Sequence, residues 1–241
     1  MDYAHLGRPG LLVSRIGLGT MNFGDVTDEG TSFEIMDTAA AKGVNFFDSA
    51  DVYGGPQAPD VAKGYGTSEE IIGRWLKASV RRDDIVLATK VYQPMGLGPN
   101  DRHLSAYRIK RACEASLRRL QTDHIDLYQM HHVDRATPWE EIWQAMGLAR
   151  LRMCGREPTR WQTNSPTTAR YVRTWATAHP RSRSAWLLHQ PAVPAVISGP
   201  RTVEQLQANL VVTSVALDER ALAELDRIRP GPGQAPESYA W

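Results

Sequence analysis

Short apolar segments alternate with helix-forming segments through the first 147 residues, and this alternation constrains the fold more than any other feature of the chain. Four segments have the length and composition of buried strands: residues 15–21, 44–50, 84–91 and 125–131. Strand and helix in repeated alternation predict a parallel sheet with right-handed crossovers. Four such units in 147 residues, about 35 residues each, favour a (β/α) barrel over an open sheet.

The segments between these strands carry apolar residues at helical spacing. Thr67 with Glu70 predicts a capping box for the second helix, and Thr137 predicts the N-cap of the fourth. The apolar residues of the fourth helix are predicted to be buried; they are Trp139, Ile142, Trp143 and Met146. The glycine fingerprint of an open dinucleotide-binding sheet is absent, because Gly17 and Gly19 are not followed by a third glycine at the required spacing.

The composition is that of a globular domain and excludes several other classes of protein. Hydrophobic residues make up 42% and charged residues 23%, which excludes a disordered chain. The formal net charge of +1 gives no reason to expect nucleic acid as the main partner. Two cysteines, Cys113 and Cys154, are too few for a disulfide framework or a metal cage. No apolar run has the length of a membrane helix and the first residues contain no secretory signal, so we expect a cytoplasmic protein.

Polar side chains stand at or just beyond the C-terminal ends of three predicted strands, where parallel barrels carry their reactive groups. They are Asp48, Tyr53, Lys90 and His131. A phenol is too weak an acid for catalysis at neutral pH, but a nearby ammonium favours the phenolate, and a carboxylate holds that ammonium. An imidazole can orient or polarise a carbonyl. The set therefore suits carbonyl reduction with Tyr53 as the proton donor, and the hydride must come from a cofactor.

Each of these residues also has a structural interpretation when it is taken alone. Asp48 can cap a turn, Lys90 can be a solvated charge at a strand end, and Tyr53 beside two glycines can be a loop aromatic. His131 can be a structural hydrogen-bonding residue. His131 and His132 lack the spacing of a metal site, so no metal is predicted. The functional interpretation rests on the recurrence of all four residues at strand ends.

Four segments resemble motifs of the aldo-keto reductase family: GLGTMNFG (17–24), FFDSADVYG (46–54), LATK (87–90) and DLYQMHHVD (126–134). The stretch VISGPRTVEQLQANL (196–210) resembles the cofactor motif of the long-chain branch, which includes potassium-channel β subunits and bacterial ketone reductases. The resemblance covers residues 1–147 and 185–241. It implies a single α/β domain with a (β/α)8 barrel, a TIM-type fold, that binds NADPH and reduces aldehydes and ketones.

The resemblance also assigns residues by position. The family's catalytic residues match Tyr53, Asp48, Lys90 and His131. Cofactor contacts are implied for Asp48 and for residues of the first strand and the C-terminal motif, namely Gly19, Thr20, Met21, Gly199, Arg201, Gln205 and Asn209. The chemistry of the C-terminal group agrees, because Thr202 and Gln205 open a helix whose N-terminus favours an anion, and Arg201 suits phosphate. The family often has an acidic residue at the position of Ala208. An ordinary capped helix after a turn is the alternative interpretation of residues 199–209.

Residues 148–184 break the family pattern. They contain eight arginines and a single acidic residue, Glu157, among many threonines and prolines, and their apolar residues follow no period. The family has more chain here, including the strand that holds the nicotinamide amide, and none of it is recognisable before residues 192–199, which look like the eighth strand. About five of eight strands are therefore predicted. The incomplete barrel leaves two exposed sheet edges, at which we expect pairing into a homo-oligomer.

Three explanations of residues 148–184 are open. A deletion or a reading-frame change has produced a defective chain; a remodelled variant survives as a swapped dimer or a partner-bound subunit; or the segment is a basic insertion that binds an anionic partner such as RNA. The predicted function is NADPH-dependent reduction of a small-molecule carbonyl, with an activity that the missing segment puts in doubt. The alternative is a non-catalytic NADP-binding or subunit-interaction protein. The loop 54–66 is expected to border the substrate site, but it identifies no substrate.

Overall fold

The computed structural model describes residues 1–7, 10–56, 64–153 and 180–228. Its centre is a parallel sheet of five strands in the order β6-β5-β4-β3-β7. The strands are β3 (Ile16–Gly19), β4 (Phe46–Asp48), β5 (Val86–Val91), β6 (Leu127–Met130) and β7 (Val196–Ser198). Each lies inside a segment that the sequence predicts as a strand. The α/β class and the prediction of about five barrel strands are confirmed.

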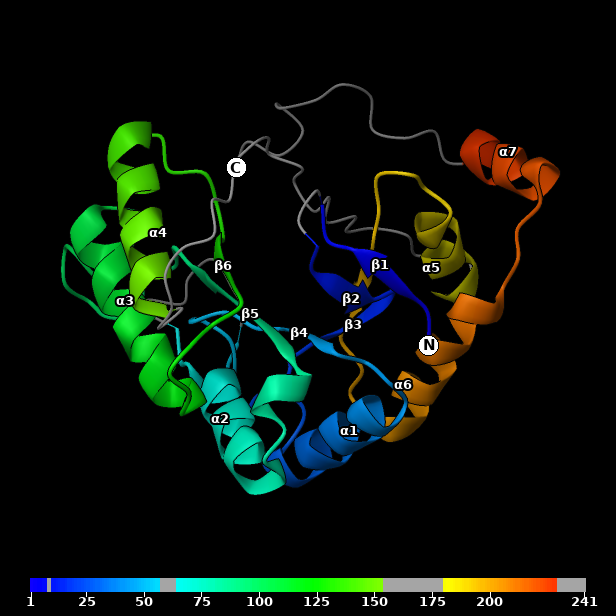
Figure 1. The fold of residues 1–241 in the computed structure, drawn as a ribbon, viewed down its shortest axis with the longest axis horizontal. Coiled ribbons are helices and arrows are strands. Elements are labelled where there is room, and N and C mark those ends of the chain that lie inside the picture. Colours follow the sequence, from blue (N-terminus) through cyan, green and yellow to red (C-terminus); the bar gives the residue numbers. More distant parts are fainter. Residues whose placement is uncertain (8–9, 57–63, 154–179, 229–241) are drawn as a thin grey trace.

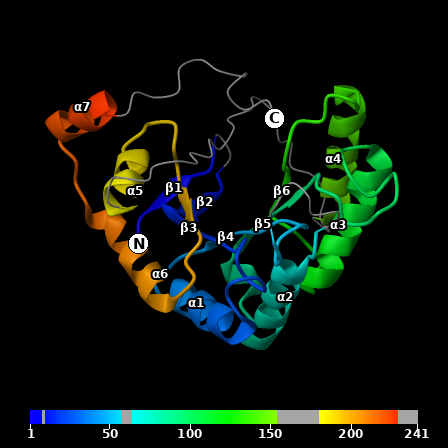
Figure 2. The same ribbon diagram turned by 180° about the vertical axis from the view of Figure 1, so that it is seen from behind.

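An arc of helices covers the outer face of this sheet in the same order as its strands, running α4, α3, α2, α1, α6, α5 (Figures 1 and 2). These helices are α1 (Glu29–Ala41), α2 (Thr67–Ser79), α3 (Ala106–Leu120), α4 (Trp139–Met153), α5 (Pro180–Leu188) and α6 (Val203–Leu210). Helix α7 (Glu219–Ile228) follows, and two short 3-10 turns are η1 (Arg82–Asp84) and η2 (Val211–Ser214). An antiparallel hairpin of β1 (Tyr3–His5) and β2 (Leu12–Ser14) precedes β3.

The hydrophobic core lies between the middle of the sheet and helices α1 to α3. Phe47 and Leu87 from the sheet and Trp75 from α2 are fully buried there, and the rings of Phe47 and Trp75 lie 5.4 Å apart. The two outer strands differ from the middle ones, because every residue of β6 and β7 is only partly buried. Within the described residues the sheet therefore ends in two partly exposed edges. Pairing of these edges with a second copy stays a prediction.

Two expectations about helices were wrong. Trp139 and Trp143 of α4 are 44% and 51% exposed and stack on each other, whereas Ile142 is buried against the core. The periodicity predicted one buried face, but α3 covers only part of the apolar surface of α4. Thr67 is the first residue of α2 and not its cap, because Gly66 precedes it in the left-handed conformation at φ +78°.

Most of the basic segment 148–184 lies outside the described residues. Residues 148–153 end α4 and residues 180–184 begin α5, while residues 154–179 are not described. The three explanations of this segment therefore stay predictions.

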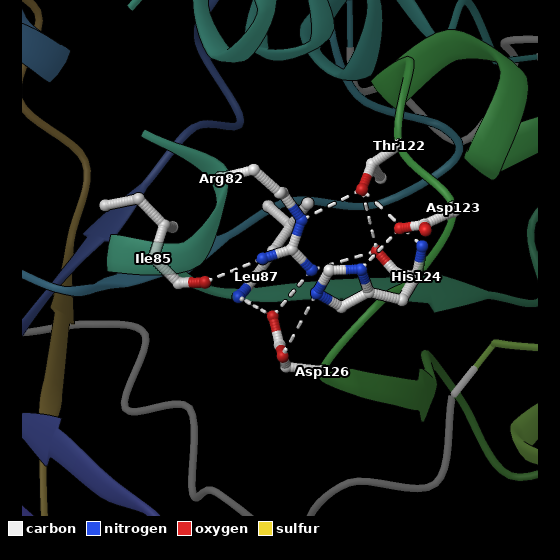
Figure 3. A network of polar contacts seen from close by, with 7 residues as sticks. All are labelled: Arg82, Ile85, Leu87, Thr122, Asp123, His124 and Asp126. Atoms are coloured by element: carbon white, nitrogen blue, oxygen red, sulfur yellow. Dashed lines mark hydrogen bonds and ion pairs between the residues drawn. The ribbon is translucent and has the colours of Figure 1, made fainter. Parts of the chain in front are cut away.

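The N-terminal ends of β5 and β6 are joined by Arg82 of η1 (Figure 3). Its guanidinium donates four hydrogen bonds of 2.8–3.0 Å; the acceptors are Thr122 Oγ1, the carbonyls of Ile85 and His124, and Asp126 Oδ2. Asp126 Oδ2 also accepts from the backbone N–H of Leu87 at 2.8 Å. This network lies at the end of the strands opposite to the predicted catalytic residues, so its role is to hold the fold.

We expect Arg82→Ala to lower the free energy of unfolding by about 2–3 kcal/mol, because several partly buried acceptors lose their donor at once. The neighbouring Arg81→Ala is the matched control, since Arg81 is 46% exposed and forms only a surface pair with Asp84 at 3.5 Å. Urea unfolding followed by circular dichroism measures both variants. Equal effects of the two substitutions would contradict this account of the network.

Candidate active site

The C-terminal ends of β4, β5 and β6, where the predicted polar groups stand, lie side by side in the sheet. Strands β4 and β5 pair with Asp48 opposite Ala88, and β5 and β6 pair with Lys90 opposite Gln129. His131 directly follows β6. The parallel register therefore brings Asp48, Lys90 and His131 to the C-terminal edge, which is the edge at which barrels carry reactive groups.

Lys90 is the centre of the site. Only 5% of the residue is exposed, and its Nζ donates to Asp48 Oδ2 at 2.5 Å and to the carbonyl of Ser49 at 2.7 Å. Nζ also lies 3.5 Å from Tyr53 Oη and 4.9 Å from the centroid of the tyrosine ring. A solvated lysine at a strand end is therefore excluded, and so is Asp48 as a simple turn cap.

Tyr53 enters the site from the loop that follows β4. Its Oη lies 3.4 Å from His131 Nε2, and the two rings meet edge to face with centroids 5.5 Å apart. The loop turns sharply at Gly54, which has φ +103°, and a Cβ there would lie 2.5 Å from the backbone nitrogen of Ser68. Only glycine fits this turn. All four residues predicted as catalytic are thus brought together.

Burial dominates the electrostatics of the site. It raises the pKa of Asp48 and lowers the pKa of Lys90, while the charge of each residue opposes the shift of the other. Asp48 Oδ1 has no hydrogen-bond partner among the described residues. Burial, with a smaller effect from the Lys90 charge, lowers the pKa of His131 to about 3. The imidazole is therefore neutral at pH 7 and suits orienting a carbonyl.

The low pKa of His131 predicts a loss of stability on acidification. The unfolded chain binds a proton at His131 near pH 6.5 while the folded chain does not until about pH 3, so stability is complete above pH 6.5 and falls below it. Between pH 7 and pH 5 we expect this residue to remove up to about 2 kcal/mol of stability. Urea unfolding of the wild type and of His131→Asn at both pH values measures the difference, and parallel pH dependences of the two proteins would contradict it.

The predicted cofactor residues of the first strand lie beside the C-terminal motif. Strand β3 pairs with β7 with Leu18 opposite Ser198, so the end of β3 lies next to Gly199. The approach is close at Gly19, where a Cβ would lie 2.8 Å from Ile197 Cγ2. Thr20, also predicted, is buried and its hydroxyl donates to the carbonyl of Asp48 at 3.1 Å, whereas Met21 is 45% exposed.

The C-terminal motif forms a capped helix with a positive N-terminus. Thr202 is the N-cap of α6 and accepts from the backbone N–H of Gln205, while Gln205 Oε1 accepts from the backbone N–H of Arg201 at 2.8 Å. Asn209 Nδ2 donates to Ser198 Oγ at 2.7 Å. The capped-helix interpretation therefore accounts for these contacts of Gln205 and Asn209. The exposed Arg201 and the N-terminus of α6 remain suited to an anion.

Two polar residues for which the sequence predicted no role connect these parts. Asn22 Nδ2 donates to Thr27 Oγ1 at 2.8 Å and to the carbonyl of Pro200 at 2.9 Å, which joins the two cofactor segments across 178 residues. Ser68 Oγ donates to the carbonyl of Thr20 at 2.8 Å. Asn22 lies within the GLGTMNFG motif, but the sequence carried no signal for Ser68, because its contact arises only when α2 packs on the sheet.

The residues present fit one end of a nicotinamide dinucleotide. Arg201 and the N-terminus of α6 provide positive charge for a phosphate. Gly199, which lies between them and the end of β3, has no side chain that would cover the backbone there. In the described ranges no group of three or more His, Cys, Asp or Glu residues is placed to hold a metal ion. Likewise, no helix in the part of the chain that is described is long and apolar enough to cross a membrane.

A parallel α/β sheet of barrel type, with tyrosine, lysine, aspartate and histidine gathered at the C-terminal ends of its strands, is the arrangement that the sequence predicts for an oxidoreductase. Comparison with protein families agrees. The profile described as "Aldo/keto reductase family" matches residues 15–152, which is more than half of the chain. The chain belongs to the aldo/keto reductase family.

The relatives of this chain include proteins named as oxidoreductases. The chain is 37% identical to the "Uncharacterized oxidoreductase YrpG" of Bacillus subtilis over the full length of both; the 332 aligned positions exceed the 241 residues of this chain by 91, so the relative contains chain that is missing here. It is 39% identical to the "Aldo-keto reductase YhdN" of Bacillus subtilis and 38% identical to a "Probable voltage-gated potassium channel subunit beta" of Arabidopsis thaliana. Each of these two matches covers 61% of this chain and 42% of the relative.

Proposed function

We propose that this protein is an NADPH-dependent reductase of aldehydes or ketones in which Tyr53 is the proton donor. The observation that carries the proposal is the arrangement around the phenol. Tyr53 Oη lies 3.5 Å from Lys90 Nζ and 3.4 Å from His131 Nε2, and Lys90 is held by Asp48 at 2.5 Å. The structural interpretations of these residues, taken one at a time, do not require them to meet at one buried point.

Each side chain has a distinct part in the proposed reaction. When bound, NADPH would supply the hydride for the carbonyl carbon. Tyr53 Oη donates its proton to the carbonyl oxygen as negative charge develops there, and the Lys90 ammonium stabilises the phenolate that remains. Neutral His131 orients the carbonyl oxygen toward the phenol. Asp48 fixes the position of Lys90 and balances its charge.

The preference for NADPH over NADH is proposed to come from Arg201. We expect Arg201→Leu to weaken NADPH binding by about 10- to 100-fold, which is the effect of losing one charge-assisted contact, and to change NADH binding by less than about threefold. Arg220→Leu is the control, because Arg220 is an exposed arginine of α7. Fluorescence titration with each cofactor makes the measurement. Equal losses for NADPH and NADH would contradict a contact with the 2′-phosphate.

A screen of aldehydes and ketones, with NADPH consumption followed at 340 nm, tests the proposed activity. Turnover of a carbonyl that stops in the Tyr53→Phe variant supports the reductase. Tight NADPH binding with no turnover of any carbonyl would instead support the alternative predicted from the sequence, a non-catalytic NADP-binding or subunit-interaction protein. The name of the Arabidopsis relative, a probable channel subunit, gives that alternative its basis.

A further inference from the structure

The loop that carries Tyr53 is tied to the protein interior by a buried arginine that takes no part in the proposed reaction. Arg108 lies in the first turn of α3, and its side chain is only 7% exposed. One terminal nitrogen of its guanidinium donates to Asp51 Oδ2 at 2.7 Å and to the carbonyl of Gln93 at 3.2 Å. A single side chain from the helix layer thus reaches two loops at the C-terminal edge of the sheet.

One of these loops carries Tyr53, and the other follows the strand that carries Lys90. Asp51 stands two residues before Tyr53, and Gln93 stands three residues after Lys90. The backbone N–H of Asp51 also donates to the carbonyl of Lys90 at 3.1 Å, which continues the pairing of the sheet beyond the end of β4. Arg108 therefore links the loop of Tyr53 to the strand of Lys90. It contacts Asp51 in that loop and Gln93, which follows the strand.

Tyr53 needs such an anchor more than its partners do. Asp48 and Lys90 lie in strands, where the parallel ladder fixes their backbones. Tyr53 lies five residues past the end of β4, and its Oη is 3.5 Å from Lys90 Nζ, at the limit of a hydrogen bond. A small shift of this loop therefore breaks the contact. A misplacement of about 1 Å in a reacting group can lower a rate by about 100-fold.

Stability alone does not explain the pair. Asp51 is fully buried, and burial raises its pKa to about 7 although the Arg108 charge opposes the shift. Asp51 Oδ1 and Arg108 Nε have no hydrogen-bond partner among the described residues. A buried ion pair with unsatisfied atoms is seldom more stable than apolar residues of the same volume. We therefore attribute the role of the pair to the position that it gives the loop and not to the stability that it adds.

We propose that Arg108 is a positioning residue, which holds the loop of Tyr53 against the strand of Lys90 through Asp51 and Gln93 and so sets the distance between phenol and ammonium. The proposal rests on the proposed reductase function for its kinetic consequence. Its structural consequence, that loss of the pair loosens residues 49–56, holds whether or not the protein reduces carbonyls.

The test uses the double variant Arg108→Met with Asp51→Leu, which removes the pair without leaving a buried charge. Hydrogen–deuterium exchange and thermal unfolding are measured first. We expect a melting temperature close to that of the wild type and faster exchange confined to residues 49–56. Arg82→Ala is the control, because it destabilises the opposite end of the strands and should not change exchange in this loop selectively. Unchanged exchange at residues 49–56 in the double variant would overturn the proposal.

Kinetics with NADPH and a carbonyl substrate provide the second measurement. The double variant should show kcat lowered about 10- to 100-fold and an NADPH Kd within twofold of the wild type. Arg108→Lys keeps the charge and can still reach Asp51, so it should recover part of the rate and remains informative if the double variant does not fold. An unchanged kcat in the double variant would overturn the proposal. A wild type without turnover refutes the reductase function, and exchange then decides the positioning role by itself.

Discussion

Tyr53→Phe should lower kcat for carbonyl reduction by about 1,000- to 10,000-fold, because it removes the proposed general acid. The phenyl ring keeps the packing of the residue, which is 5% exposed among Ala50, Val52 and Met95. The NADPH Kd and the melting temperature should therefore stay close to those of the wild type. Steady-state kinetics at 340 nm, fluorescence titration and circular dichroism measure the three quantities.

Tyr65→Phe is the matched control for this variant. Tyr65 is 51% exposed, and it contacts the same loop, where a Cβ on Gly55 would lie 2.2 Å from its ring. Its phenol hydroxyl has no proposed part in the reaction, so kcat should change by less than about twofold on its removal. A Tyr53→Phe variant that keeps more than a tenth of the wild-type kcat would show that the proton comes from another group.

Lys90→Met should destabilise the fold by about 3–5 kcal/mol at pH 8 as well as abolish activity, because it leaves the Asp48 carboxylate buried without its partner. Asp48 is 1% exposed, and Lys90 Nζ is the one hydrogen-bond partner of its carboxylate among the described residues. The cost should shrink as the pH falls. Without Lys90, burial keeps the folded pKa of Asp48 above its unfolded value, so protonation relieves the folded state and stability is lost as the pH rises through the folded pKa.

The double variant Lys90→Met with Asp48→Asn separates stability from catalysis. It removes the uncompensated charge, so it should recover most of the stability lost in Lys90→Met and remain inactive. Urea unfolding at pH 5 and pH 8 measures the stability of both variants. A double variant no more stable than Lys90→Met at pH 8 would show that the unpaired carboxylate is not the source of the loss.

Local patterns were enough to predict the sheet and the centre of the site. Strands β4, β5 and β6 are short apolar runs, and the C-terminal ends of parallel strands lie at the same end of the sheet, so Asp48, Lys90 and His131 were expected to meet once the strands were identified. Tyr53 was harder, because it follows a strand by five residues. It was predicted from its position just beyond that strand, the resemblance of FFDSADVYG to a family motif assigned it the same role, and the structure brings its hydroxyl to Lys90.

Features that arise from contacts between distant segments were not predictable. Periodicity marks which residues of α4 are apolar, but it does not say whether a neighbour covers them, and Trp139 and Trp143 are in fact exposed. The pair of Arg108 and Asp51 joins a helix to a loop 57 residues away, and neither residue type signals it. The predicted cofactor residues lie together, but only a bound cofactor can test their contacts.

Thermal unfolding of the purified protein with and without NADPH, followed by circular dichroism, tests the central claim most directly. The claim is that the five strands in the described part of the chain are enough to assemble the site and hold the cofactor. The account predicts a cooperative transition that NADPH moves to higher temperature, since saturation at about 100 times Kd adds about 2.7 kcal/mol of stability. A chain with no cooperative transition, or with a transition temperature that NADPH does not change, would contradict the claim. The family motifs would then show only the ancestry of the chain.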